Sequence, residues 1–204
     1  MEKQKSRTQV INRQKIIDAA TRVFAKYGFN GTTLDQIAIM ASMSKPNLLY
    51  YFKTKRTLYR TVLEDTLNQW LGCLKEWQVE GSARQTISNY IDKKFEFSRD
   101  HAFGSRVFVN EILEGAPNLK YLLGEDLKLF VSQNILTIKG WIKSGEIEPI
   151  EPIHLIFMIW AVTQHYADFS TQIETLTGKT LADKDFYQEA KKNITQMILR
   201  GVLK

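Results

Sequence analysis

Apolar residues recur at helical spacing along almost the whole chain of 204 residues, and this pattern restricts the fold class more than any other feature. Between Arg13 and Tyr27 they fall at i, i+3, i+4 and i+7 positions, which form one face of an amphipathic helix. Only 4 Pro and 11 Gly interrupt the chain, and no segment alternates with the period of two that marks a strand. The sequence therefore predicts an all-α fold.

The predicted helices form two sets. The first set is short, with helices expected over 13–27, 34–41 and 45–51. The second set is longer, over 55–79, 82–99, 104–113, 118–143, 153–176 and 183–201. Because no Gly/Ser-rich linker separates them, we expect a small domain at 1–54 and a helical bundle at 55–204, joined rigidly by the helix that begins at Lys55.

Capping residues indicate where the second and third short helices begin. Thr33 and Gln36 have the spacing of a capping box, and Ser44 is suited to N-cap the next helix. Pro46 then falls in the first turn, where its missing N–H costs little. Three residues, 42–44, separate the two helices, which is the outline of a helix-turn-helix.

The positive charge of the chain is concentrated in its first third. Residues 1–60 hold 12 Lys/Arg and 3 Asp/Glu, a net charge of +9, whereas residues 61–204 hold 16 and 19, a net charge of −3. A basic segment on a near-neutral body indicates a polyanionic partner, either nucleic acid or an anionic membrane.

The third helix carries side chains suited to double-stranded DNA. Lys45 and Asn47 lie in its first turn, where Lys pairs well with guanine and Asn with adenine. Tyrosine hydroxyls and the following cations suit phosphate oxygens, as does a helix N-terminus. The predicted DNA-binding residues are Thr33, Ser44, Lys45, Asn47, Tyr50, Tyr51 and Lys55.

Two other classes of protein remain alternatives at this point. A basic peripheral membrane module would turn apolar residues of 1–60 toward solvent, whereas Leu48, Leu49 and Phe52 fit an inward face better. A helical-bundle enzyme would need a convergent acid–base set, and neither that set nor a phosphate-binding or nucleophile motif is readable. The three histidines lack Cys or carboxylate at metal-ligand spacing, so we expect no metal and no cofactor.

The sequence also predicts a cytoplasmic location. The longest apolar run, 155–162, is far shorter than a membrane span, and residues 1–14 contain no apolar signal region. The single Cys73 cannot form an internal disulfide, which favours a reducing compartment.

The first 60 residues resemble the tetracycline-repressor family of one-component regulators. The resemblance rests on a long series of matching positions: Ala20, Phe24, Tyr27-Gly28-Phe29, Gly31-Thr32-Thr33, Ile37-Ala38, Ala41, Met43-Ser44-Lys45, Leu48 to Phe52, Lys55 and Leu58. Motifs farther along, including Gly115-Ala116-Pro117 and Tyr166-Ala167-Asp168-Phe169, are similar to a pyrimidine-responsive member. The resemblance implies a two-fold helical dimer, an N-terminal DNA-binding domain, and uracil or thymine as effector of a transcriptional repressor.

The residues themselves also favour a homodimer. Residues 153–162 are apolar on every side, so this helix must be buried on every side. Either a partner subunit covers it, or it is the central helix of its own bundle. For the effector, the resemblance points to the flat rings of Trp70 and Trp160 and to the amide of Gln164, which can both donate and accept. Core packing is the alternative role for each of these three side chains.

Overall fold

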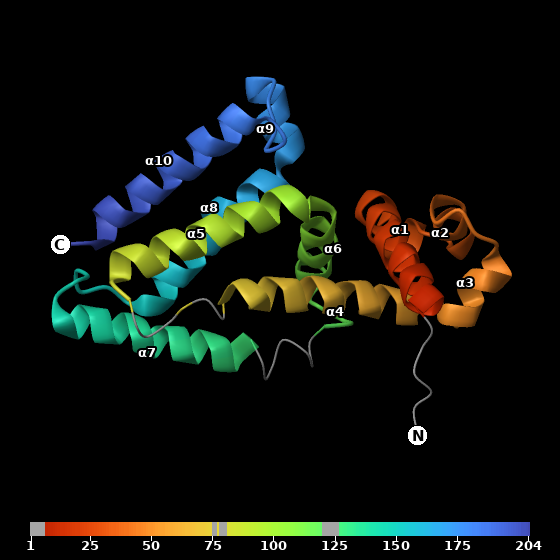
Figure 1. Cartoon of the computed structure of the whole chain (residues 1–204), viewed down its shortest axis with the longest axis horizontal. Coiled ribbons are helices and arrows are strands. Elements are labelled where there is room, and N and C mark those ends of the chain that lie inside the picture. Colours follow the sequence, from red (N-terminus) through yellow and green to blue (C-terminus); the bar gives the residue numbers. More distant parts are fainter. Residues whose placement is uncertain (1–6, 75–76, 78–80, 120–126) are drawn as a thin grey trace.

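The computed structural model describes residues 7–74, 77, 81–119 and 127–204, and these form ten helices (Figure 1). They are α1 (Arg7–Gly31), α2 (Leu34–Met40), α3 (Lys45–Tyr51), α4 (Lys55–Leu74), α5 (Ala83–Asp100), α6 (Ala102–Leu113), α7 (Lys128–Ser144), α8 (Pro152–Asp168), α9 (Ser170–Thr177) and α10 (Lys184–Val202). The predicted all-α class is confirmed. In the described ranges, the one β-type pairing is an isolated bridge between Ile147 and Leu203.

Helices α1 to α3 pack into a small unit at one end of the molecule (Figure 1). Gly28 has φ of 67°, so it breaks the regular geometry of α1 where the sequence predicts its end. Phe24, Ile37 and Leu48, one from each helix, are at most 1% exposed. Their shared core holds α3 against α1 and α2 and leaves the opposite face of α3 in solvent.

Helix α4 joins this unit to the bundle, as Figure 1 shows, and contacts α1, α5, α6 and α7. The helix is shorter than predicted, because it ends at Leu74 and Trp77 is not helical. Positions 75–76 and 78–79 of the predicted helix lie outside the described residues, as does the side chain of Cys73.

The bundle is built around α5 and α8, which pack against each other along much of their length. Helix α10 packs against α5, α7 contacts α8 and α4, and α6 contacts α1, α4 and α8. Helix α6 is therefore a second element, besides α4, that connects the bundle with the N-terminal unit (Figure 1).

Two of the predicted long helices are wrong in part, one in its interior and one at its start. The predicted helix 153–176 is two helices, because Phe169 leaves helical geometry at φ −109° and ψ 28°. Side chains of α6 hold the residues on either side of this break: Ser105 Oγ bonds Asp168 Oδ1 at 2.6 Å, and Arg106 bonds Ser170 Oγ at 3.1 Å.

The predicted helix 118–143 begins, in the described residues, only at Lys128, while 120–126 lie outside them. Asn118 and Leu119 are in a turn, because the Glu111 carboxylate accepts hydrogen bonds from the backbone N–H and the side-chain amide of Asn118. In both cases tertiary contacts outweigh a helical pattern in the sequence.

Candidate DNA-binding surface and effector site

Helices α2 and α3 begin at capping residues that fix their mutual geometry. The Thr33 side chain accepts from the Gln36 N–H, and the Gln36 side chain accepts from the Thr33 N–H, so the predicted capping box is present. Ser44 Oγ likewise accepts from the Asn47 N–H at 3.3 Å. Both capping side chains are exposed, which leaves the two helix N-termini accessible to an anion.

Lys45 and Asn47 are exposed in the first turn of α3, as predicted for side chains that reach base edges. The Lys45 ammonium is already engaged within the protein, because it lies 2.8 Å from Oδ2 of Asp35 on α2. Any contact of Lys45 with guanine therefore competes with this ion pair.

The two tyrosines of α3 connect it to the start of α1, which the sequence did not reveal. Tyr50 is 62% exposed and its hydroxyl accepts from Gln9 at 3.2 Å, while the half-buried Tyr51 accepts from Asn12 at 3.3 Å. Gln9 and Asn12 thus position the hydroxyls that the sequence predicts for phosphate. In the sequence, the only indication of this contact is that the start of α1, which contains Gln9 and Asn12, is polar.

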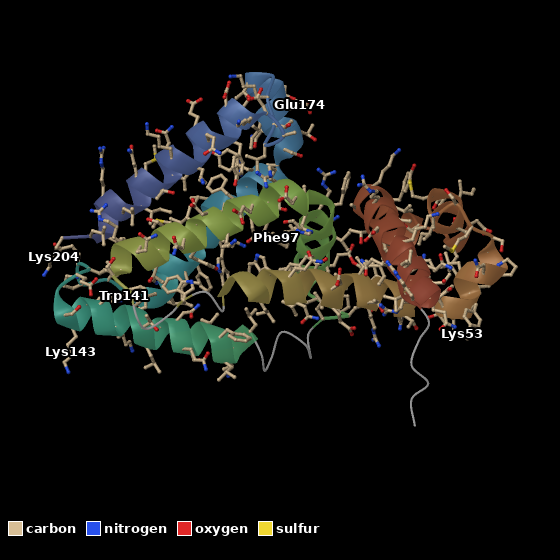
Figure 2. All side chains as sticks on the ribbon, in the orientation of Figure 1. Lys53, Phe97, Trp141, Lys143, Glu174 and Lys204 are labelled. Carbon is tan, nitrogen blue, oxygen red and sulfur yellow. The ribbon has the colours of Figure 1, made fainter. Side chains whose placement is uncertain are left out.

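Lys55, which the sequence predicts to contact DNA, makes its contacts within the protein. Its ammonium donates to the carbonyl oxygens of Phe29 and Thr32 at 2.7 and 2.8 Å and lies 4.6 Å from the centre of the Phe29 ring. It therefore fastens the connection between α1 and α2 to the start of α4. Lys53 beside it is exposed and lies near α3, at the end of the molecule far from α10 (Figure 2).

Trp70 on α4 and Trp160 on α8, two of the three side chains that the resemblance suggests for the effector, contact each other inside the bundle. Their ring centres are 4.5 Å apart with the planes tilted by 54°, and the Trp160 N–H donates to the Tyr90 hydroxyl at 2.6 Å. Gln164 lies one turn after Trp160 on α8 and is half-buried. By contrast, Trp77 and Trp141 stack on each other at 5.6 Å as part of the core.

A fully buried lysine lies beside this pair, and the sequence analysis missed it. Lys94 on α5 is 0% exposed, and its ammonium is 4.3 Å from the centre of the Trp70 ring. A usable signal existed, since Lys94 is spaced by three and four residues from the buried Ile91 and Ser98. A lysine on the core face of a helix is unusual enough to mark a site.

Asp168 is the carboxylate whose titration responds to this lysine. Burial raises the pKa of Asp168, whereas the bond from Ser105 and the positive charges of Lys94, Arg106 and His165 act in the opposite direction. The half-buried Asp168 carboxylate on α8 and the buried Lys94 ammonium on α5 therefore lie close enough to interact.

Within residues 55–204, close to the N-terminal unit, the Tyr59 hydroxyl on α4 hydrogen-bonds the Glu111 carboxylate on α6. Both side chains are buried, at 3% and 1% exposure, and Glu111 also holds the Asn118 turn. Burial, and then the charge of the Glu111 carboxylate, raise the pKa of the Tyr59 hydroxyl. This bond links α6 to α4, the helix that joins the bundle to the N-terminal unit.

One face of α8 and α10 is apolar but exposed. Phe157 and Met158 are 49% and 40% exposed on α8, and Met197 is 68% exposed on α10. Met158 and Met197 line a groove of about 310 Å³ between the two helices. The single chain thus buries only one side of the segment that is apolar all round.

Within 7–74, 77, 81–119 and 127–204, no helix is long and apolar enough to cross a membrane. The same ranges hold no group of three or more His, Cys, Asp or Glu side chains able to bind a metal ion.

An exposed third helix on a basic N-terminal unit, joined through α4 to a larger helical bundle, is the arrangement of a helix-turn-helix regulator of transcription. The chain belongs to the tetR family of bacterial regulatory proteins. The model of that family's N-terminal region matches residues 16–62, and the model of the YcdC-like protein C-terminal region matches residues 63–204. The chain is accordingly a DNA-binding transcriptional regulator and not an enzyme.

Individual relatives agree with this assignment. The chain is 45% identical over 198 residues to the HTH-type transcriptional regulator RutR of Escherichia coli K12, covering 97% of this chain and 93% of that protein. The putative transcriptional regulator SCO4942 of Streptomyces coelicolor has the same fold, with a TM-score of 0.71 at 20% identity over 94% of this chain and 98% of that one. AibR in complex with isovaleryl coenzyme A and operator DNA also has this fold, with a TM-score of 0.69 at 14% identity, covering 91% of this chain and 97% of that one.

Proposed function

We propose that this regulator is a homodimeric cytoplasmic repressor that binds a pseudo-palindromic operator and releases it when a small molecule binds the bundle. Residues 1–54 form the DNA-binding domain, and residues 55–204 bind the effector and dimerise. The observation that carries the proposal is the contrast between the two parts of the chain: residues 1–60 carry a net charge of +9, whereas the bundle buries Lys94 beside the adjoining rings of Trp70 and Trp160.

In this proposal α3 enters the major groove. Lys45 and Asn47 read base edges, Tyr50 and Tyr51 contact phosphates in positions set by Gln9 and Asn12, and the N-termini at Thr33 and Ser44 bind further phosphates. Lys55 contributes mainly by holding α4 against the α1–α2 connection, with its remaining N–H available to phosphate.

A second subunit is proposed to cover the exposed apolar face of α8 and α10. Exposed apolar surface of this kind, formed by Phe157, Met158 and Met197, marks interaction sites. A two-fold dimer places two α3 helices in the same orientation relative to two half-sites, so the operator has matching symmetry with half-sites about one helical turn or more apart.

The proposed effector is uracil or thymine, bound beside Trp70, Trp160 and Gln164. Its support is the resemblance of the bundle to a pyrimidine-responsive member of the family and the character of this interior. A pyrimidine ring presents both donors and acceptors, and burying them unpaired would cost about 1–3 kcal/mol per group. The amide of Gln164 and the charge of Lys94 suit such a ring better than an acyl chain.

Release from DNA requires only that the effector bind the DNA-incompetent arrangement more tightly than the competent one. Helix α6 is the proposed route, because it contacts α8 in the bundle and α1 in the DNA-binding domain. The bond between Tyr59 and Glu111 would transmit its movement to α4.

Two measurements test the proposal at the level of DNA binding and assembly. Fluorescence anisotropy with a duplex selected by the protein from a random pool should show log affinity falling steeply with log salt concentration, since phosphate contacts release counterions. Light scattering should give about twice the 23.6 kDa chain mass, and Met158→Arg should shift it toward one chain. A salt-independent affinity, or a stable wild-type monomer at micromolar concentration, contradicts the proposal.

A further inference from the structure

Four consecutive residues at the start of α6 contact four different helices. Phe103 packs against Arg22 of α1, whose guanidinium lies 4.9 Å from the centre of the ring. Gly104 lies against Thr66 of α4. Residues 105–106 hold the two sides of the break between α8 and α9. The start of α6 is therefore attached to the DNA-binding unit, to the helix that joins it to the bundle, and to the bundle itself (Figure 1).

Gly104 allows α6 to approach α4 closely. A Cβ atom on Gly104 would lie 3.0 Å from Oγ1 and 3.4 Å from Cγ2 of Thr66. The Thr66 side chain is buried, and its hydroxyl donates to the Val62 carbonyl at 2.9 Å, so it has little freedom to turn aside. Glycine is a poorer helix former than alanine. Its presence at this position therefore favours a requirement for the short distance between the two helices.

The contact between Arg22 and Phe103 joins α1 to α6 at an open part of the boundary between the two units. Both residues, together with Thr66 and Gly104, line a cleft of about 310 Å³ between α1, α4 and the corner of α5 and α6. Phe103 remains 42% exposed. Since side chains do not fill this cleft, a small rotation of α1 against α6 meets little opposition there. The attraction of the guanidinium to the ring face opposes such a rotation.

We propose that Phe103 and Gly104 are positioning residues for DNA binding, because they fix the orientation of the DNA-binding unit relative to the bundle. A dimer occupies both half-sites of an operator only if its two α3 helices have the matching separation and direction. Binding to a single half-site does not depend on that match. This inference rests on the proposed function, because it assumes a dimer with two α3 helices. It adds the residues that set their geometry.

Fluorescence anisotropy on the full-length protein tests this with two duplexes, the selected operator and the same duplex with one half-site scrambled. Gly104→Ala should weaken operator binding several-fold and leave half-site binding unchanged, because the added methyl group forces α6 and α4 apart. Adding Thr66→Ala to this variant removes the obstructing atoms and should restore operator binding. Gly140→Ala in α7 is the matched control, since a Cβ there meets open space, and both affinities should stay as in wild type.

Phe103→Leu and Phe103→Tyr form an independent pair, because both are uncharged and only the second keeps an aromatic ring for Arg22. Phe103→Leu should weaken operator binding several-fold without affecting half-site binding, whereas Phe103→Tyr should bind as wild type does. This pair decides the matter if Gly104→Ala does not fold.

An unchanged ratio of the two affinities in both Gly104→Ala and Phe103→Leu overturns the inference and leaves the proposed function intact. Loss of both affinities together with a lower melting temperature also overturns it, because the residues would then only stabilise the fold. A wild type that binds the two duplexes equally well overturns the proposed two-fold recognition and the inference with it.

Discussion

The Lys45 ammonium and the Asp35 carboxylate lie 2.8 Å apart, so an ion pair ties the recognition helix α3 to α2. The two side chains remain 47% and 61% exposed, and such pairs typically stabilise a fold by only about 0.2–1 kcal/mol. The ion pair matters more for DNA recognition, because a base can accept a hydrogen bond from the Lys45 ammonium only in competition with Asp35.

Asp35→Asn should therefore strengthen DNA binding several-fold, since it releases Lys45 and removes a negative charge that faces phosphates. The melting temperature should change little. Anisotropy titrations at two salt concentrations measure this, with Asp18→Asn on α1 as the control for net charge. Weaker binding by Asp35→Asn would mean that the ion pair positions Lys45 for DNA.

Asn47→Ala should relax sequence preference at one base position by about 1–3 kcal/mol, because Asn pairs with adenine through two hydrogen bonds. The side chain is exposed, so the folded structure should be unaffected. Titrations against duplexes with single base changes identify the position. An unchanged preference would show that another part of α3 faces the bases.

Lys55→Met should lower the free energy of unfolding by about 2 kcal/mol, because it removes two hydrogen bonds from an ammonium to backbone carbonyl groups. Lys53→Met is the matched comparison, since Lys53 is exposed. It should leave stability unchanged and reduce the dependence of log affinity on log salt by about one. Chemical denaturation and salt titrations separate the two effects, and an unaltered stability of Lys55→Met would refute the structural role of Lys55.

The DNA-binding unit could be predicted in detail because its determinants are local. Capping residues such as Thr33 and Ser44 act within four residues of chain, and the apolar spacing within each helix marks the inward face that carries Phe24, Ile37 or Leu48. The family resemblance added its function. The sequence could not predict that the Lys55 ammonium donates hydrogen bonds to backbone carbonyl groups 23 and 26 residues away.

The bundle was harder to predict, because contacts between residues far apart in the sequence determine where its helices end and which side chains are buried. The break at Phe169 depends on Ser105 and Arg106, more than 60 residues earlier, which bind the residues on either side. The burial of Lys94 depends on Trp70 of another helix. Helical periodicity identifies the buried face of each helix, but it does not identify the helix that packs against that face.

The Tyr59–Glu111 contact predicts a sensitivity to alkaline pH. Burial first, and then Glu111, raise the pKa of Tyr59 above its ordinary value of 10.0. Above pH 10 the unfolded chain releases a proton that the folded chain keeps, so stability falls as pH rises, by at most about 1.4 kcal/mol per pH unit for one such group. The pKa values of Tyr166 and Tyr187 are also raised by burial and add to the slope.

Tyr59→Phe should make this decline less steep, although it lowers stability at neutral pH through loss of the bond to Glu111. Urea unfolding between pH 8 and 11 gives the slope for both proteins. Equal slopes would show that Tyr59 ionises at the same pH in the folded and unfolded chains.

The central claim, that a small molecule in the bundle controls DNA binding, is tested most directly by adding uracil to the complex of the protein with its selected duplex and following anisotropy. The account predicts release of the duplex by uracil from wild type. It predicts release weakened tens-fold or more in Gln164→Leu, which keeps the volume but loses the amide, with DNA affinity in the absence of uracil unchanged. A complex that persists at saturating uracil and thymine would contradict the proposed effector, and equal release from both proteins would remove Gln164 from the site.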